Sequence, residues 1–322
     1  MVTVLCGGFG AARFLSGLRG RTAGLCCVGN TADDLEWLGL HVSPDLDSVL
    51  YALAGCFDEE RGWGLRGDTF HCNAALARHG AGWFQVGDQD MAQHLERTRL
   101  LREGRTLGEA TARLAESWGV EARLLPMSDA PVRTFVSTDE GTLPLQEYLV
   151  RRHAQPRVIA VDQAGMDLAR PAPGVLAALE AADLVVLAPS NPVSSLGPIL
   201  ALPGVREALA GRGGGTVAVT PVVSGREPAT PPEQGRARVR AAFLEARGVP
   251  HRAAAVAGLY RGLVDGFVLD QSDAGQHAEI EAMGVRVLCA DTLAATASER
   301  AGLAAAVLAF GRELRDRPRA RP

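Results

Sequence analysis

The chain has 322 residues, of which 47% are apolar and 22% are charged, so its composition is that of an ordinary globular protein. Its formal charge of -4 argues against a nucleic acid partner bound through a broad cationic face. The sequence contains no lysine, so all 33 basic residues are arginines. This excludes a Schiff-base nucleophile, a pyridoxal phosphate anchor and a Walker A lysine.

The cysteines and histidines follow no zinc-binding pattern. There is no Cys-x-x-Cys pair among the six cysteines, which we interpret as buried, reduced residues. The first residues include no basic segment, and no apolar run approaches the roughly 18 residues of a membrane span. We therefore expect a cytoplasmic protein without membrane contact, and we assign the histidines no role.

Short apolar runs recur along the chain, and each ends near a small or polar residue. They occupy residues 2–6, 25–28, 158–161, 184–188, 217–220, 267–270 and 285–289. Amphipathic helical stretches separate most of them. This alternation predicts an α/β fold, namely a Rossmann-like, mostly parallel sheet with helices on both faces. Ligands of such folds bind at the carboxyl ends of the strands.

Residues 88–153 interrupt this rhythm. Two helices are expected there, one over 91–102 and one after Thr106, and a β segment follows at 132–138. A capping box formed by Thr106 and Glu109 marks the start of the second helix. We predict one α/β domain over residues 1–315 with this helical module inserted over the site. The proline-containing stretch 224–234 is expected to be a mobile loop, and residues 316–322 a disordered tail.

The first strand leads into a glycine-rich turn. Gly7, Gly8 and Gly10 precede a predicted helix, and backbone N–H groups at such a turn can meet a phosphate. The alternative is a tight turn without a ligand. Arg13 stands where a dinucleotide fingerprint needs a small residue, so a nicotinamide enzyme is disfavoured.

Acidic residues follow the second strand and open a later helix. Asn30 and Asp33 lie in a segment that faces either a ligand or solvent. Asp45 and Asp47 stand in the first turn of a helix, where carboxylates also simply offset the helix dipole. Asp68 lies in a third, glycine-rich and aromatic loop.

Several other polar or aromatic segments are candidates for ligand contact. A tryptophan-containing loop is often a binding surface for a flat ligand, and the hydroxyls and amide after the strand at 184–188 suit a nucleotide. The residues singled out in these segments are Trp63, Phe70, Gln89, Met127, Asp129, Ser190, Asn191 and Pro192.

Taken together, these segments resemble the 2-phospho-L-lactate transferase family of deazaflavin coenzyme F-420 biosynthesis. The resemblance runs from about residue 2 to residue 310. It is carried, in the family's order, by GGFGAARFL, NTADD, SPDLDSVLYALAG, GWG followed by DTF, WFQVGDQD, LPMSDAPVRT, APSNPVSSLGPIL and DTL.

The resemblance implies transfer of a phospholactyl-type group from a guanosine diphosphate-linked donor to the ribityl hydroxyl of the deazaflavin FO. GMP leaves, Mg²⁺ assists, and a homodimer is expected. Asp45 and Asp68 would bind the metal, with Asp45 and Asp47 catalytic. FO would contact Asp47, Trp63, Phe70, Gln89, Met127 and Asp129. The donor would contact Gly7, Gly8, Gly10, Arg13, Asn30, Asp33, Ser190, Asn191 and Pro192.

Two positions depart from the family pattern. Gln89 replaces a basic residue between two aspartates, and Arg226 stands in a loop where members often carry lysine. An alternative function is that of a related regulator, which binds a nucleotide sugar without catalysis. Whether the donor carries phospholactate, phosphoenolpyruvate or phosphoglycerate depends on pocket geometry, because these acids differ by one small group.

Overall fold

The fold is built on a seven-stranded parallel sheet. A computed structural model describes residues 1–212, 215–228 and 230–316. The strand order is β12-β11-β10-β9-β1-β2-β5, and every neighbouring pair is parallel. The strands are β1 (Val2–Cys6), β2 (Leu25–Gly29), β5 (Arg123–Pro126), β9 (Leu184–Leu187), β10 (Thr216–Val219), β11 (Gly266–Asp270) and β12 (Arg286–Ala290). The predicted α/β class is confirmed.

Helices cover both faces of this sheet because the central strands are apolar on both sides. Every residue of β1, β9, β10 and β11 is buried. One face packs against α1 (Gly8–Leu18), α2 (Pro44–Ala54), α5 (Leu107–Ser117) and α12 (Ala297–Asp316). The other packs against α6 (Val175–Glu180), α7 (Leu196–Ala201), α8 (Val205–Gly211), α9 (Pro231–Glu245), α10 (Ala253–Leu259) and α11 (His277–Glu281).

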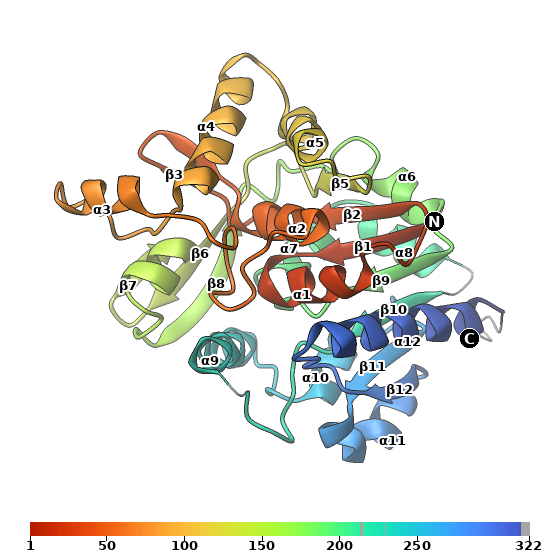
Figure 1. Ribbon diagram of the computed structural model, residues 1–322. Coiled ribbons are helices and arrows are strands. Elements are labelled where there is room, and N and C mark those ends of the chain that lie inside the picture. The colour runs from red at the N-terminus through yellow and green to blue at the C-terminus, as the bar shows by residue number, and fades with distance from the viewer. Residues whose placement is uncertain (213–214, 229, 317–322) are drawn as a thin grey trace.

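A second group of elements lies beside the sheet. It contains the hairpin β3 (Leu35–Trp37) and β4 (Leu40–Val42), the helices α3 (His71–Ala77) and α4 (Asp88–Arg102), and the antiparallel sheet β7-β6-β8. That sheet comprises β6 (Arg133–Thr138), β7 (Gly141–Pro144) and β8 (Val158–Ala164), and the helical turn η1 (Glu147–Arg151) lies between β7 and β8. A second helical turn, η2 (Gln271–Gln276), follows β11 of the main sheet. In Figure 1 the small sheet and α9 lie on the left, and both chain termini lie on the right.

Three predicted elements differ from the structure. The run at 158–161 is a strand, but as part of β8 it pairs with β6 in the small sheet and not with the main sheet. Within 88–153, α5 packs against the main sheet and β5 joins its edge, so this segment is not one helical module. β5 begins at Arg123 and ends at Pro126, so its two leucines do not stand out as an apolar run. The division into a domain with one insertion stays a prediction.

The stretch 224–234 is not a loop throughout. Thr230 caps α9, and a capping box with Glu233 starts the helix at Pro231. The prolines that suggested a loop therefore mark a helix start. Asp316 ends α12, and the rest of the predicted tail, residues 317–322, lies outside the described residues, as does residue 229 of the predicted loop.

The predicted helices at 91–102 and after Thr106 are confirmed as α4 and α5, and the Thr106–Glu109 capping box is present. In the described part of the chain, no helix is both long and apolar enough to cross a membrane.

The contact between α1 and α12 depends on a glycine. A Cβ on Gly17 of α1 would overlap the backbone carbonyl of Arg300 in α12 and lie 3.0 Å from Arg300 Cβ. We expect Gly17→Ala to lower the free energy of unfolding by about 1–3 kcal/mol, because the two helices must separate. Urea unfolding measures this. Gly258→Ala in α10 is the matched control, since no atom lies within 4 Å of its added Cβ. It should be neutral or slightly stabilising, and an equal loss in both variants would contradict the packing argument.

Candidate functional site

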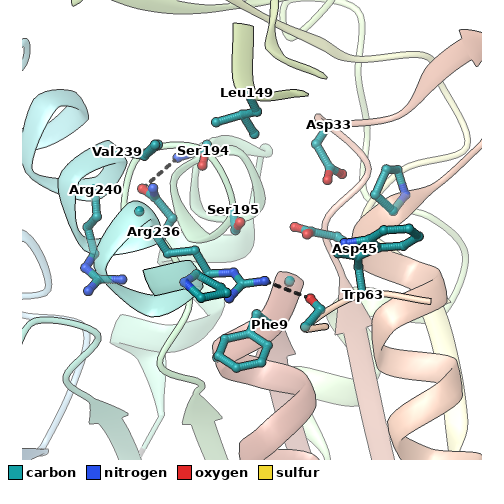
Figure 2. Close-up of a pocket in the computed structure, with 18 of the residues that line it drawn as sticks. Phe9, Asp33, Asp45, Trp63, Leu149, Ser194, Ser195, Arg236, Val239 and Arg240 are labelled. Atoms are coloured by element: carbon teal, nitrogen blue, oxygen red, sulfur yellow. Dashed lines mark hydrogen bonds between the residues drawn. The ribbon is translucent and has the colours of Figure 1, made fainter. Parts of the chain in front are cut away.

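A cavity of about 1420 Å³ opens at the carboxyl ends of the strands. Its wall combines the turn after β1, the loops after β9, β10 and β12, the start of α2, the loop at 61–64, the segment at 145–159 and one side of α9. Figure 2 shows α9 on one side and Asp45 and Trp63 on the other. The volume exceeds the usual range for one drug-sized ligand, so two substrates fit together.

The glycine turn lies at the base of the cavity. Gly8 has a φ of 70°, a left-handed conformation that favours glycine, and α1 begins at this residue. Gly7 donates its N–H to Ser190 Oγ at 3.1 Å, which ties the turn to the loop after β9. A Cβ on Gly10 would overlap the carbonyl oxygen of Pro189. The start of α1 and the loop after β9 therefore form one surface.

Asp45 and Asp33 form a buried pair of carboxyl groups on the cavity wall. Asn30 Nδ2 donates to Asp45 Oδ2 at 2.9 Å, and Ser195 also donates to this carboxylate. Asp45 is 6% exposed and Asp33 is 7% exposed. Burial raises the pKa of Asp45 to about 6, although the hydrogen bonds from Asn30 and Ser195 oppose the shift. Burial and then the charge of Asp45 raise the pKa of Asp33 well above its usual range.

Asp47 has the opposite electrostatic environment. Arg97 of α4 binds it with two nitrogens, one at 3.0 Å from Asp47 Oδ2. Burial would raise the pKa of Asp47, but the charges of Arg97 and His94, together with hydrogen bonds from Arg97 and Gln93, outweigh it and the pKa is lowered. Both side chains are almost wholly buried, although Asp47 still lines the cavity. Asp47 is therefore a fixed anion at neutral pH.

A neighbouring cluster of Asp47, Asp90 and His94 has the ligand atoms to hold a metal ion. Burial raises the pKa of Asp90 to about 7 and lowers that of His94 to about 4. Tyr51 Oη donates to Asp90 at 2.6 Å. No sequence pattern was recognised for this cluster, although Asp90 and His94 are four residues apart on one helix. Because the Arg97 guanidinium already binds Asp47, a second cation there would be repelled.

Trp63 lies on the cavity wall beside a stacked arginine. The guanidinium carbon of Arg61 lies 5.0 Å from the Trp63 ring centroid and 4.7 Å from that of Phe70. The two rings meet edge to face at 5.8 Å. Phe70 therefore supports Trp63 and does not line the cavity itself.

Of the predicted site residues, ten line the cavity: Gly7, Gly8, Gly10, Arg13, Asp33, Asp45, Asp47, Trp63, Ser190 and Asn191. Asn30 lies behind them and holds Asp45. Arg13 is already bound to Glu233 and to the carbonyls of Leu293 and Ala294.

The remaining predicted residues do not line the cavity; they are Asp68, Phe70, Gln89, Met127, Asp129 and Pro192. Asp68 accepts hydrogen bonds from the backbone N–H groups of Gln89 and Asp90 at 3.0 Å each and so caps α4. Gln89 is exposed. Met127 is in the core, and Asp129 accepts from Gly108 N in the first turn of α5.

The arginines of α9 are site residues that sequence reasoning missed, because their segment was expected to begin as a loop. Arg236 donates to Gly62 O at 3.0 Å and lies 4.0 Å from the Phe9 ring centroid. The spacing of Glu233, Arg236 and Arg240 on one helical face was the available signal. Arg226 of the preceding loop is bound to Asp270 and Asp291 and does not line the cavity.

Comparison with known proteins identifies the family. Residues 2–297 match the family described as 2-phospho-L-lactate transferase CofD. The chain belongs to this family. It is 41% identical to a phosphoenolpyruvate transferase of Streptomyces griseus over 98% of this chain and 99% of that protein. It is 38% identical to a 2-phospho-L-lactate transferase of Methanosarcina acetivorans, over 90% and 92% of the two chains.

The fold has a solved counterpart. A UPF0052 family protein of Bacillus halodurans superposes with a TM-score of 0.65 at 16% identity and covers 95% of this chain and 98% of that one. This likeness supports the fold alone. The resemblance inferred from the sequence motifs is thus confirmed, and family membership favours a transferase over a regulator without catalysis.

The buried pair predicts an unusual pH dependence of stability. A carboxyl group with a raised pKa stabilises the fold below its ordinary pKa of about 4, and that contribution is lost as the pH rises through about 6. We expect Asp45→Asn, measured in EDTA, to raise the melting temperature at pH 8 and to leave it nearly unchanged at pH 4. The gain at pH 8 is at most about 3 kcal/mol. A variant that melts below the wild type at pH 8 would contradict the electrostatic assignment.

The Arg97–Asp47 ion pair predicts a different variant effect. Arg97→Met leaves a buried carboxylate without its partner, which should cost about 3–5 kcal/mol of unfolding free energy at pH 7. Urea unfolding measures this loss. Adding Asp47→Asn to the same chain should recover part of it, because the uncompensated charge is gone. If the double variant were no more stable than Arg97→Met, the charge would not be the cause.

Proposed function

We propose that the protein transfers a phosphate-linked acid, phosphoenolpyruvate or 2-phospho-L-lactate, from a guanosine diphosphate-linked donor to the ribityl hydroxyl of FO. The hydroxyl oxygen forms a bond to the phosphorus that carries the acid, the bond from that phosphorus to the GMP oxygen breaks, and GMP leaves. The hydroxyl proton passes to a base or to solvent. The proposal includes a cytoplasmic homodimer, as the family resemblance implies.

The observation that carries the proposal is the shared cavity. One wall offers the free N–H groups at the start of α1 and the Ser190 and Asn191 side chains, which suit the phosphates of the donor. The Trp63 ring, on the same side of the cavity as Asp45, suits the flat ring of FO. The carboxyl groups of Asp33 and Asp45 line the same cavity. Phosphoryl transfer needs alignment and charge neutralisation more than a protein nucleophile, and the chain supplies those groups without a lysine.

The paired carboxyl groups fit the expected Mg²⁺. Burial raises the pKa values of Asp33 and Asp45, and the charge of Asp45 adds to the shift of Asp33. A divalent cation between the two would favour their charged forms. We propose these two as the metal ligands. Bound Mg²⁺ neutralises charge on the transferring phosphate. The Asp68 carboxylate caps α4 and lies outside the cavity wall, so its metal role stays a prediction from the sequence.

Asp47 is suited to hold a substrate hydroxyl by a hydrogen bond. Because Arg97 lowers its pKa, it is a poor proton acceptor but a strong hydrogen-bond acceptor. We propose that it orients the FO hydroxyl. Gly7 and Gly8 leave room for the donor next to Asp45, since a Cβ on Gly7 would overlap the Asp45 carboxylate.

We expect Asp45→Asn to lower turnover at least about a hundred-fold at saturating Mg²⁺, because one charge that neutralises the transition state is lost. Release of GMP from the donor in the presence of FO measures this. The matched control is Asp68→Asn, which should lose about 1 kcal/mol of stability through weaker capping of α4 and keep its turnover. Equal loss of turnover in both variants would restore Asp68 to the metal site, and unchanged turnover in Asp45→Asn would remove Asp45 from it.

A further inference from the structure

A line of charged residues runs along the cavity side of α9. Glu233, Arg236 and Arg240 are spaced by three and four residues, so they share one helical face, and all three line the cavity. Glu233 binds Arg13 of α1. Arg236 donates to Gly62 O and stacks on Phe9. The first two positions of this line are therefore tied to the opposite wall.

Arg240, one turn further along, has no such partner. Across residues 1–212, 215–228 and 230–316, its guanidinium makes no hydrogen bond or ion pair, and its Nε is wholly buried without an acceptor. Burial lowers the pKa of Arg240 to about 10, so the side chain is still a cation at neutral pH. Figure 2 shows it on the α9 side of the cavity, away from Asp33 and Asp45.

The other arginines of the cavity wall differ. Carboxylates bind four of them: Arg13, Arg61, Arg157 and Arg300. Arg238 is exposed to solvent at the rim. Burial and next the charge of Arg240 lower the pKa of His251, which is therefore neutral at pH 7 and adds no second positive charge. Buried polar groups in native proteins are nearly always hydrogen-bonded. The buried Nε of Arg240 therefore needs an acceptor that no described residue provides, while the side chain as a whole is half-buried on the cavity wall.

The geometry points to Arg240 as the residue that binds an oxyanion of the donor, either on its diphosphate or on the carboxylate of the transferred acid. The inference rests on the proposed function and adds a specificity-determining residue to it. A guanidinium group can donate two parallel hydrogen bonds to two oxygens of a carboxylate or phosphate. A lysine ammonium acts instead as a point charge without this bidentate geometry. Arg240 lies one helical turn beyond Arg236, which contacts Phe9 of the glycine turn, so it would bind a part of the donor that the turn does not hold.

The test compares Arg240→Gln with Arg206→Gln, which removes the same charge from an exposed position of α8 that does not line the cavity. Titration calorimetry measures GDP binding, and then phosphoenolpyruvate binding with GMP present. We expect Arg240→Gln to weaken one of them about ten-fold and Arg206→Gln to weaken both less than two-fold. Weaker GDP binding assigns Arg240 to the diphosphate. Unchanged GDP binding with weaker phosphoenolpyruvate binding assigns it to the carboxylate.

Two results would overturn the inference. One is a calorimetric result in which Arg240→Gln does not differ from its control: either both ligands bind with unchanged affinity, or both variants weaken binding equally. Equal weakening would mean only a general effect of protein charge. The other is a ligand-free Arg240→Gln protein that melts several degrees below the wild type, since loss of an unpartnered buried cation should not destabilise the fold. Inorganic pyrophosphate is titrated in parallel. If the wild type binds pyrophosphate but neither GDP nor phosphoenolpyruvate, the proposed function fails, and the pyrophosphate affinities of the two variants still test the anion site.

Discussion

Two carboxyl groups that are buried side by side, Asp33 and Asp45, constrain everything around them. Among the described residues neither has an arginine partner, and burial disfavours their charged forms. Asn30 holds Asp45 from behind, and the turn beside it must be glycine because a Cβ on Gly7 would meet the carboxylate. The end of β1, the glycine turn and the start of α2 are therefore packed tightly around these two carboxyl groups.

The same principle separates the two aspartates of α2. Asp45 and Asp47 lie in one helical turn, yet the pKa of the first is raised and that of the second is lowered. The difference comes from α4, which brings Arg97 to Asp47 and no cation to Asp45. Environment sets the role of each carboxyl group, so one suits a metal ion and the other a hydrogen-bonded hydroxyl.

The helices around the site serve it in different ways. α4 is capped by Asp68 and carries Arg97, which is paired with Asp47. α9 starts at Pro231 and carries Arg240, which has no partner among the described residues. The cavity between α9 and the 61–64 loop is crossed by the contact of Arg236 with Gly62 and Phe9. Arg236 and the Glu233–Arg13 ion pair thus connect α9 to the facing wall, whereas Arg240 has no partner among the described residues.

The sequence by itself determined the α/β class, most strands of the main sheet, the glycine turn and the family, because apolar periodicity and local turn chemistry are written in neighbouring residues. It indicated that Asp45, Trp63 and Ser190 belong to one site, and all three line the same cavity, since strand ends converge on one edge of a parallel sheet. Tertiary structure alone decided that Asp68 and Asp129 cap helices, that β8 leaves the main sheet, and that Arg97 pairs with Asp47 while Gln89 is exposed. These outcomes depend on contacts between distant segments, whose energies no local pattern records.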